Sequence, residues 1–156
     1  MSDGLILQPA GVSDLDDVML VMNAAFDPEY GEAWTAAQCA GLMSMPGVWL
    51  MIAREDGKPA GFSLSRIIAG EAELLLIAVR KSAHRRGIGG ALLKAFISES
   101  ASRGAEKLHL EVRHGNHAVE LYKRAGFQEV GRRFNYYRGR SGQLYDALTL
   151  ARAANS

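Results

Sequence analysis

Residues 73–93 constrain most strongly what this chain can fold into. An apolar run of strand length, residues 73–79, leads into a basic turn rich in glycine, and the turn leads into a helix-forming segment. The run is continuous, which predicts a strand buried on both faces. Gly87, Gly89 and Gly90 lack a Cβ, so the backbone there can bend and approach a ligand closely. The first amides of the following helix have no intrahelical partner, so the turn is expected to hold a phosphate or pyrophosphate.

The composition limits the classes of function to be considered. The chain has 156 residues, a length typical of one domain, so residues 1–156 are expected to form a single domain. A formal net charge of +1 provides no overall field that would favour nucleic acid or a membrane as a partner. The sequence has neither an uncharged apolar window of about 18 residues nor an N-terminal secretory signal, so we expect a cytoplasmic protein.

Hydrophobic periodicity and turn signals divide the chain into strands and helices. Strands are expected at residues 5–8, 48–54, 59–68, 73–79, 107–113, 127–137 and 143–150, and helices at residues 13–26, 35–43, 87–103 and 116–124. Thr35 and Gln38 have the spacing of a capping box at the start of the second helix. The order β-α-α-β-β-β-α-β-α-β-β predicts an α/β fold in which a mixed sheet has helices on both faces.

Residues 107–113 alternate strictly between apolar and polar side chains. In a strand, Leu108, Leu110 and Val112 would therefore face one way and pack in the core. Glu111 would face the other way, toward either solvent or a cleft.

Three classes of ligand compete for the glycine-rich turn. A nucleoside triphosphate loop ends in Gly-Lys-Ser or Gly-Lys-Thr, whereas Gly89 is followed by Gly90 and Ala91. The dinucleotide fingerprint needs a third glycine that is missing here, and the dinucleotide fold opens with its motif, whereas strands precede the turn in this chain. Coenzyme A is the third class, and its pyrophosphate fits the same amides.

The turn resembles the acyl-coenzyme-A-binding motif of the GCN5-related N-acetyltransferase (GNAT) family, Arg/Gln-x-x-Gly-x-Gly/Ala between a strand and a helix. Residues 121–127, Leu-Tyr-Lys-Arg-Ala-Gly-Phe, are similar to that family's Leu-Tyr-x-x-x-Gly-Phe segment. Residues 110–113 and 135–137 look like segments of the ribosomal-protein alanine N-acetyltransferases, which acetylate the N-terminal α-amine of a ribosomal protein. The resemblance implies a GNAT-type fold with a splayed central sheet, and acetyl-coenzyme A as the cosubstrate.

The same resemblance implies roles for particular residues. Glu111 corresponds to the general base and Tyr122 to the acid for the departing thiolate, and an amide near Val79 would stabilise the oxyanion. The implied coenzyme contacts are Ile77, Ala78, Val79, Arg85, Arg86, Gly87, Ile88, Gly89, Gly90 and Asn116.

Two positions depart from the family's pattern. His84 stands where the motif usually has Arg or Gln, so the amides of residues 85–90 are expected to carry the pyrophosphate more than this side chain does. The spacing between Glu111 and Tyr122 is one residue shorter than in the alanine acetyltransferases. The family's helix-start asparagine therefore corresponds to Asn116 or to the position of Gly115.

Each candidate side chain also has a purely structural interpretation. Glu111 would be a solvated strand residue paired with Arg113 or another neighbour, and Tyr122 would be a core residue. Tyr136 and Tyr137 would either flank the acceptor substrate or form ordinary aromatic cross-strand pairs.

A metal centre and a covalent intermediate are not expected. The four histidines lack a partner cysteine or a convincing group of carboxylates at metal-ligand spacing. Cys39 is the only cysteine, and it lies in an expected helix without a basic neighbour, so it is interpreted as a small core residue.

The leading hypothesis is therefore an N-acetyltransferase that transfers acetyl directly from acetyl-coenzyme A to a primary amine, as a monomer or a homodimer. The preferred acceptor is the N-terminal α-amine of a protein such as a ribosomal protein, and the alternative is a small-molecule amine. A flat peptide groove would favour the first and a closed acidic pocket the second. Residues 27–34 are expected to border the acceptor site. A coenzyme-A-binding module without catalysis is a third possibility, which would need neither Glu111 nor Tyr122.

Overall fold

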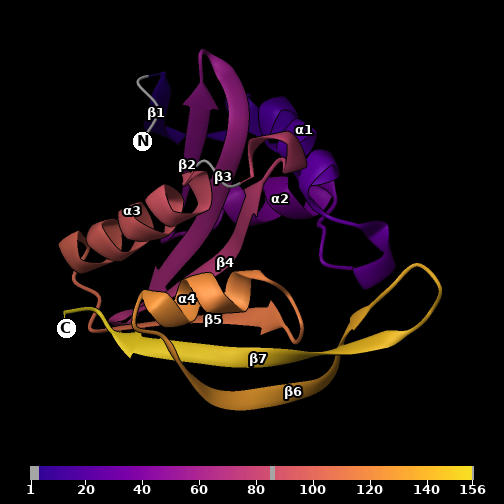
Figure 1. Ribbon diagram of the computed structural model, residues 1–156. Helices are drawn as coiled ribbons and strands as arrows, with labels where there is room; N and C mark the ends of the chain where they lie inside the picture. Colours follow the sequence, from indigo (N-terminus) through magenta and orange to yellow (C-terminus); the bar gives the residue numbers. More distant parts are fainter. Residues whose placement is uncertain (1–3, 85–86, 156) are drawn as a thin grey trace.

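The computed structural model describes residues 4–84 and 87–155 and contains a seven-stranded mixed sheet (Figure 1). The strands are β1 (Leu5–Ala10), β2 (Val48–Glu55), β3 (Lys58–Ile68), β4 (Glu71–Val79), β5 (Lys107–Arg113), β6 (Gln128–Arg138) and β7 (Leu144–Ala153). The helices are α1 (Leu15–Ala25), α2 (Ala36–Met43), α3 (Ile88–Ser102) and α4 (Ala118–Arg124). This element order confirms the α/β order predicted from the sequence.

Short 3₁₀ turns are the main local feature that the periodicity did not predict. They lie at Val12–Asp14, Pro28–Tyr30 and Lys81–Ala83. The first of them delays the start of α1 to Leu15. The predicted capping box of α2 is confirmed, because the Gln38 amide donates to Thr35 Oγ1 at 3.1 Å and the Thr35 amide donates to Gln38 Oε1 at 2.8 Å.

The spatial order of the strands is β1-β2-β3-β4-β5-β7-β6. Strands β1 to β4 pair antiparallel, and β7 lies between β5 and β6, antiparallel to both. The pairing of β4 with β5 is parallel and joins the two parts of the sheet. No helix in the described residues has the length and apolar character needed to cross a membrane.

The pairing of β4 with β5 is short. It runs from Glu71 opposite Lys107 to Leu74 opposite Leu110, after which each strand continues without pairing to the other. The register between β3 and β4 shifts at the same level, so that Leu75 is the extra residue of a β-bulge. A bulge bends its strand, so the sheet splays here, as the family resemblance implied.

The splay changes the burial of β4. The sequence predicted a strand buried on both faces, but Leu75, Leu76 and Ile77 are only partly buried. The prediction was wrong for this part of the strand, because β4 loses its neighbour β5 where these residues begin.

Helices cover both faces of the sheet, as predicted. In Figure 1, α3 and α4 lie in front of the sheet and α1 and α2 lie behind it. On the α1 face, Leu50 and Phe62 pack in one core cluster with Met22. On the α3 face, Trp49 stacks on Phe96 with the ring centroids 6.2 Å apart.

Candidate active site

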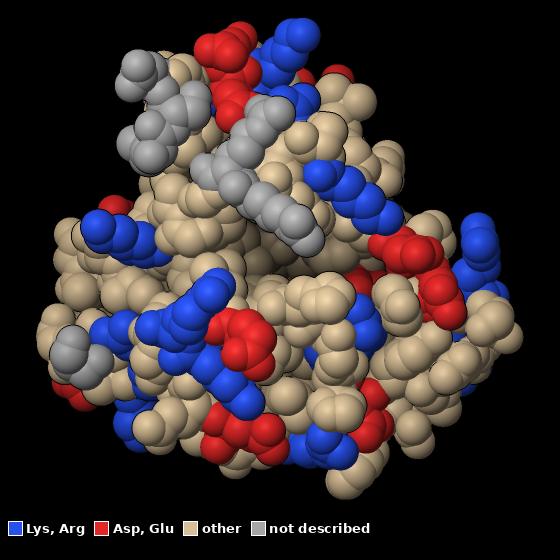
Figure 2. Space-filling view, in the orientation of Figure 1, with Lys and Arg blue, Asp and Glu red and all other residues tan. Residues whose placement is uncertain are grey.

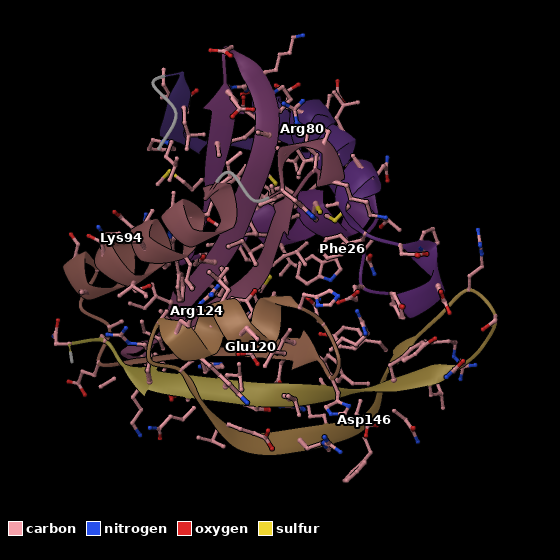
Figure 3. The ribbon with its side chains drawn as sticks, viewed as in Figure 1. Phe26, Arg80, Lys94, Glu120, Arg124 and Asp146 are labelled. Carbon is pink, nitrogen blue, oxygen red and sulfur yellow. The ribbon has the colours of Figure 1, made fainter. Side chains whose placement is uncertain are left out.

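A pocket of about 130 Å³ opens where β4 and β5 part. Six of the residues singled out from the sequence line it: Ile77, Glu111, Asn116, Tyr122, Tyr136 and Tyr137. Residues of the segment between α1 and α2 line it as well, including Phe26, which Figure 3 labels to the right of β4 in this view. The pocket thus brings together residues from segments that lie far apart in the sequence.

The backbone of β4 presents an unpaired edge to the gap. The Arg80 amide donates to the Ala60 carbonyl of β3 at 2.9 Å. Peptide groups alternate in direction along a strand, so the backbone of Ala78 also turns toward β3 and those of Ile77 and Val79 turn toward the gap. Of the three strand residues expected to contact a coenzyme, two therefore have backbone groups on the open edge.

The side chain of His84 contacts that open edge of β4. Its Nε2 lies 2.9 Å from the Val79 carbonyl oxygen, and a carbonyl can only accept, so this ring nitrogen is the donor. That nitrogen is therefore engaged within the protein and is not free to donate to a ligand. This geometry fits the expectation that amides of the turn, more than the His84 side chain, hold a pyrophosphate.

The described part of the turn has the backbone shape needed for an anion site. Gly87 has φ +77°, in the left-handed region that favours glycine. The Ala91 amide donates to the Gly87 carbonyl, so the amides of Ile88, Gly89 and Gly90 precede the first bond of α3. A Cβ at Gly89 would meet nothing closer than 3.5 Å, so packing within the protein does not require a glycine there. Arg85 and Arg86, also expected to contact the coenzyme, lie outside the described residues.

A hollow beside this turn is visible on the surface. Figure 2 shows the molecule recessed between the start of α3 and α4. A ligand lying there would have the turn at one end and the open edge of β4 alongside it.

Glu111 is held by two neighbours in the sheet. Thr149 Oγ1 donates to Glu111 Oε2 at 2.6 Å, and Arg133 Nε donates to Glu111 Oε1 at 2.9 Å. The carboxylate is 11% exposed, whereas Arg133 is 62% exposed. The partner suggested from the sequence, Arg113, instead lies 3.2 Å from Glu32.

Tyr122 is a buried core residue and also lines the pocket. It is 4% exposed and packs edge-on against Phe127, with the ring centroids 6.2 Å apart. Burial raises the pKa of its phenol well above the usual value, with smaller contributions from Tyr137 and Glu32. The hydroxyl is therefore a proton donor throughout the neutral pH range.

Glu32 is a pocket residue that the sequence did not single out. Asn116 Nδ2 donates to Glu32 Oε2 at 2.8 Å, and Asn116 Oδ1 accepts from the Ala118 amide at 2.8 Å. Asn116 therefore uses both ends of its amide inside the protein, at the start of α4 and on the segment between α1 and α2. One feature of the sequence indicated this role: Glu32 is an acidic residue within residues 27–34, which were expected to border the acceptor site.

Tyr136 and Tyr137 lie at an irregularity in β6. Arg133 pairs with Ala147 and Tyr137 with Tyr145, so three residues of β6 face one residue of β7. Within this bulge Asn135 has φ +54°, and its amide donates to Asp146 Oδ1 at 2.9 Å. The two tyrosine rings contact each other at right angles, 5.0 Å apart, and both line the pocket. Burial raises the pKa of Tyr137 as well.

Residues 15–127 match the model of the acetyltransferase (GNAT) family. The chain belongs to this family. It is 41% identical over 98 residues to the ribosomal protein bS18-alanine N-acetyltransferase of Escherichia coli K12, a match that covers 62% of this chain and 66% of that protein, just under two thirds of its length. It is 33% identical over 147 residues to a mycothiol acetyltransferase of Clavibacter michiganensis, covering 88% of this chain and 47% of that protein.

A solved structure agrees with the family assignment. The crystal structure of the ribosomal-protein-S18-alanine N-acetyltransferase from Escherichia coli superimposes with a TM-score of 0.86 at 30% sequence identity, covering 97% of this chain and 95% of that one. Among the described residues of the present GNAT protein, no group of three or more His, Cys, Asp or Glu side chains is placed to hold a metal ion.

Two loops of this GNAT protein close one side of the pocket by touching backbone to backbone. A Cβ on Gly31, which has φ +68°, would lie 1.9 Å from the Arg138 carbonyl oxygen. The Arg140 amide donates to the Pro28 carbonyl at 3.2 Å, and the rings of Tyr30 and Tyr145 meet edge-on. The segment between α1 and α2 is thus fastened to the β6–β7 hairpin.

We expect Gly31→Ala to destabilise the fold by about 1–3 kcal/mol, because the added methyl group collides with backbone that cannot move aside cheaply. Gly41→Ala is the matched control: Gly41 lies in α2 with nothing within 4 Å of an added Cβ, and there alanine should stabilise by up to about 1 kcal/mol. Urea unfolding measures both changes. Equal stability of the two variants would contradict the backbone contact.

Proposed function

We propose that this chain transfers the acetyl group of acetyl-coenzyme A directly to the N-terminal α-amine of a protein, such as a ribosomal protein. The observation that carries the proposal is that Glu111 and Tyr122 line one pocket at the parting of β4 and β5 in a member of the GNAT family. The relatives named for acetylation of a ribosomal-protein alanine support the choice of acceptor. Such an acceptor implies a cytoplasmic enzyme.

Acetyl-coenzyme A would supply an activated thioester, and residues of the turn and of β4 fit its polar groups. The left-handed Gly87 and the amides of residues 88–90 suit the pyrophosphate, with Arg85 and Arg86 as proposed additional contacts. The backbone groups of Ile77 and Val79 suit the amides of the pantetheine arm. The backbone of Ala78 turns toward β3 and the side chain of Asn116 is engaged within the protein, so both fit a supporting role better.

The proposed reaction needs three proton and charge steps. The acceptor amine has a pKa of about 8 and arrives largely as an ammonium ion, so Glu111 first takes a proton from it, directly or through water. Each carboxylate oxygen can accept two hydrogen bonds, so the bonds from Thr149 and Arg133 leave room for this contact. The amine nitrogen then bonds to the thioester carbon, and an amide on the open edge of β4 stabilises the oxyanion. Tyr122 protonates the thiolate as the carbon–sulfur bond breaks, and the nitrogen loses its second proton as the neutral amide forms. That proton restores the Tyr122 phenol, and Glu111 releases the first proton to solvent before the next turnover.

A small-molecule amine is a second candidate acceptor, supported by one specific observation. Glu32, Glu73 and Glu111 line the pocket, and no Lys, Arg or His does so within the described residues. An acidic pocket suits a free cationic amine as well as it suits an N-terminus. The similarity of this chain to a mycothiol acetyltransferase is compatible with such an acceptor.

A turnover panel tests the proposal and separates the two acceptors. The purified protein is incubated with acetyl-coenzyme A and N-terminal ribosomal-protein peptides, the same peptides with a blocked N-terminus, or small amines, and thiol release is measured. We expect turnover with free N-termini and none with blocked ones. Coenzyme binding without any turnover would contradict the proposal that the protein is an enzyme. Turnover of small amines alone would contradict the proposal that the acceptor is a protein N-terminus.

We expect Glu111→Gln to lower kcat by roughly 100-fold near pH 6.5 and by less near pH 9, because more of the acceptor amine is already deprotonated at high pH. Glu129→Gln, the same change at an exposed position on β6, should leave the pH profile unaltered. The pH profile of kcat measures both variants. An unchanged profile for Glu111→Gln would remove Glu111 from the mechanism.

We expect Tyr122→Phe to lower kcat by about tenfold without weakening coenzyme binding, because the phenylalanine keeps the ring packing and removes only the proton donor. Since burial raises the pKa of Tyr122, its protonation should add no ionisation to the wild-type profile between pH 6 and 9. Steady-state kinetics and coenzyme titration measure the two effects. Tyr145→Phe, outside the pocket on β7, is the control, and equal losses of kcat and coenzyme affinity in Tyr122→Phe would indicate a packing role instead.

A further inference from the structure

The three carboxylates that line the pocket differ in how their oxygens are occupied. Both oxygens of Glu111 accept hydrogen bonds, from Thr149 and Arg133. Both oxygens of Glu32 also have close partners, Asn116 at 2.8 Å and Arg113 at 3.2 Å. These two carboxylates are already fixed by the protein.

Glu73 is held more loosely. Its Oε1 lies 3.7 Å from His109 Nε2 and 3.8 Å from Arg66 Nη2, distances longer than ordinary hydrogen bonds. Within the described residues the Glu73 carboxylate makes no shorter polar contact, and it is 25% exposed. Among the described residues, it is therefore the one pocket carboxylate with an oxygen, Oε2, that has no close protein partner.

The position of Glu73 relative to Glu111 follows from the strand register. Glu73 on β4 is opposite His109 on β5, and Glu111 lies two residues further along β5 on the same face. A rise of about 3.3 Å per residue and a strand spacing of about 4.8 Å put the two glutamate positions roughly 8 Å apart. A cation bound at Glu73 would thus lie within a side chain's length of an amine at Glu111.

The charges around Glu73 keep it ionised. Contact with His109 lowers the pKa of Glu73, burial opposes this, and the charges of His109, Arg66 and Arg133 lower it further. Contact with Glu73 in turn raises the pKa of His109 against the effect of burial, and Glu71 and Glu111 add to the rise. Glu73 thus faces the pocket, and two groups that do not line the pocket balance its negative charge. Arg66 is always charged, whereas His109 titrates.

We propose that Glu73 determines acceptor specificity by binding a second positive charge, a Lys or Arg side chain at the second or third position behind the reacting amine. This rests on the proposed N-acetyltransferase function and names the acceptors that it favours. The guanidinium or ammonium group would donate to the oxygen that the protein leaves without a close partner.

The test compares acceptor peptides that differ in one charge. They carry arginine or its uncharged analogue citrulline at the second or third position, and kcat/KM is measured for each. We expect the wild-type protein to prefer arginine by about tenfold at one of these positions, the size of a charge-assisted hydrogen bond. Glu73→Gln should reduce this ratio to near one, and Glu73→Asp should keep part of it. Because both peptides are measured on the same variant, a loss of folded protein cancels in the ratio.

Glu120→Gln makes the same chemical change on the exposed face of α4, outside the pocket, and should keep the wild-type ratio (Glu120 is labelled in Figure 3). The ratio should also rise with pH as His109 loses its proton, since arginine stays charged and both peptides share the α-amine titration. A wild-type ratio near one at both positions, or one that survives in Glu73→Gln, would overturn the proposal. Absence of turnover with every peptide and amine would instead contradict the proposed function itself.

Discussion

The parting of β4 from β5 is the constraint on which the rest of this structure depends. The two strands pair only as far as Leu74 and Leu110, and the bulge at Leu75 bends β4 at that level. Backbone groups beyond this point lose their natural partners, and unpaired backbone buried away from water is costly. The open edge persists because the α3 face of both parts of the sheet packs in a single core cluster, in which Leu74, Leu110 and Tyr122 take part. The site therefore exists because β4 and β5 do not pair along their full length.

Contacts between distant segments give the pocket its chemical character. The segment between α1 and α2 reaches α4 through Glu32 and Asn116, and it reaches the β6–β7 hairpin through Gly31. Glu111 depends on Thr149 and Arg133, from β7 and β6. Side chains fixed in this way lose little freedom when a substrate binds, which is the condition for effective positioning of reacting groups.

The sequence was sufficient to predict those features that are encoded locally. Strict alternation in residues 107–113 placed Glu111 on the polar face of its strand, and capping and glycine signals defined the helices. The polar partners of Glu111 were not predictable in the same way. They exist because β7 lies between β5 and β6, and a hairpin pattern does not reveal which of its strands joins the rest of the sheet.

The burial of residues 75–77 in β4 was predicted wrongly for a related reason. A continuous apolar run indicates that side chains avoid water, but it does not distinguish packing against a strand from lining a pocket. Leu75, Leu76 and Ile77 do the second, because the partner strand leaves. The bulge around Asn135 likewise depends on a hydrogen bond to Asp146, eleven residues away across the hairpin. Such features depend on tertiary geometry, which no window of sequence contains.

The distribution of charge connects binding with release in the proposed reaction. The carboxylates of Glu32, Glu73 and Glu111 line the pocket, whereas their cationic partners lie outside the lining, so the interior attracts cations without any carboxylate being left unbalanced. Acetylation converts an ammonium ion into a neutral amide. The attraction between Glu111 and the reacting amine is therefore lost in the step that forms the product, while the carboxylate remains ready for another ammonium ion. A pocket that relied on apolar contacts alone would bind acceptor and product about equally and would gain no such bias toward release.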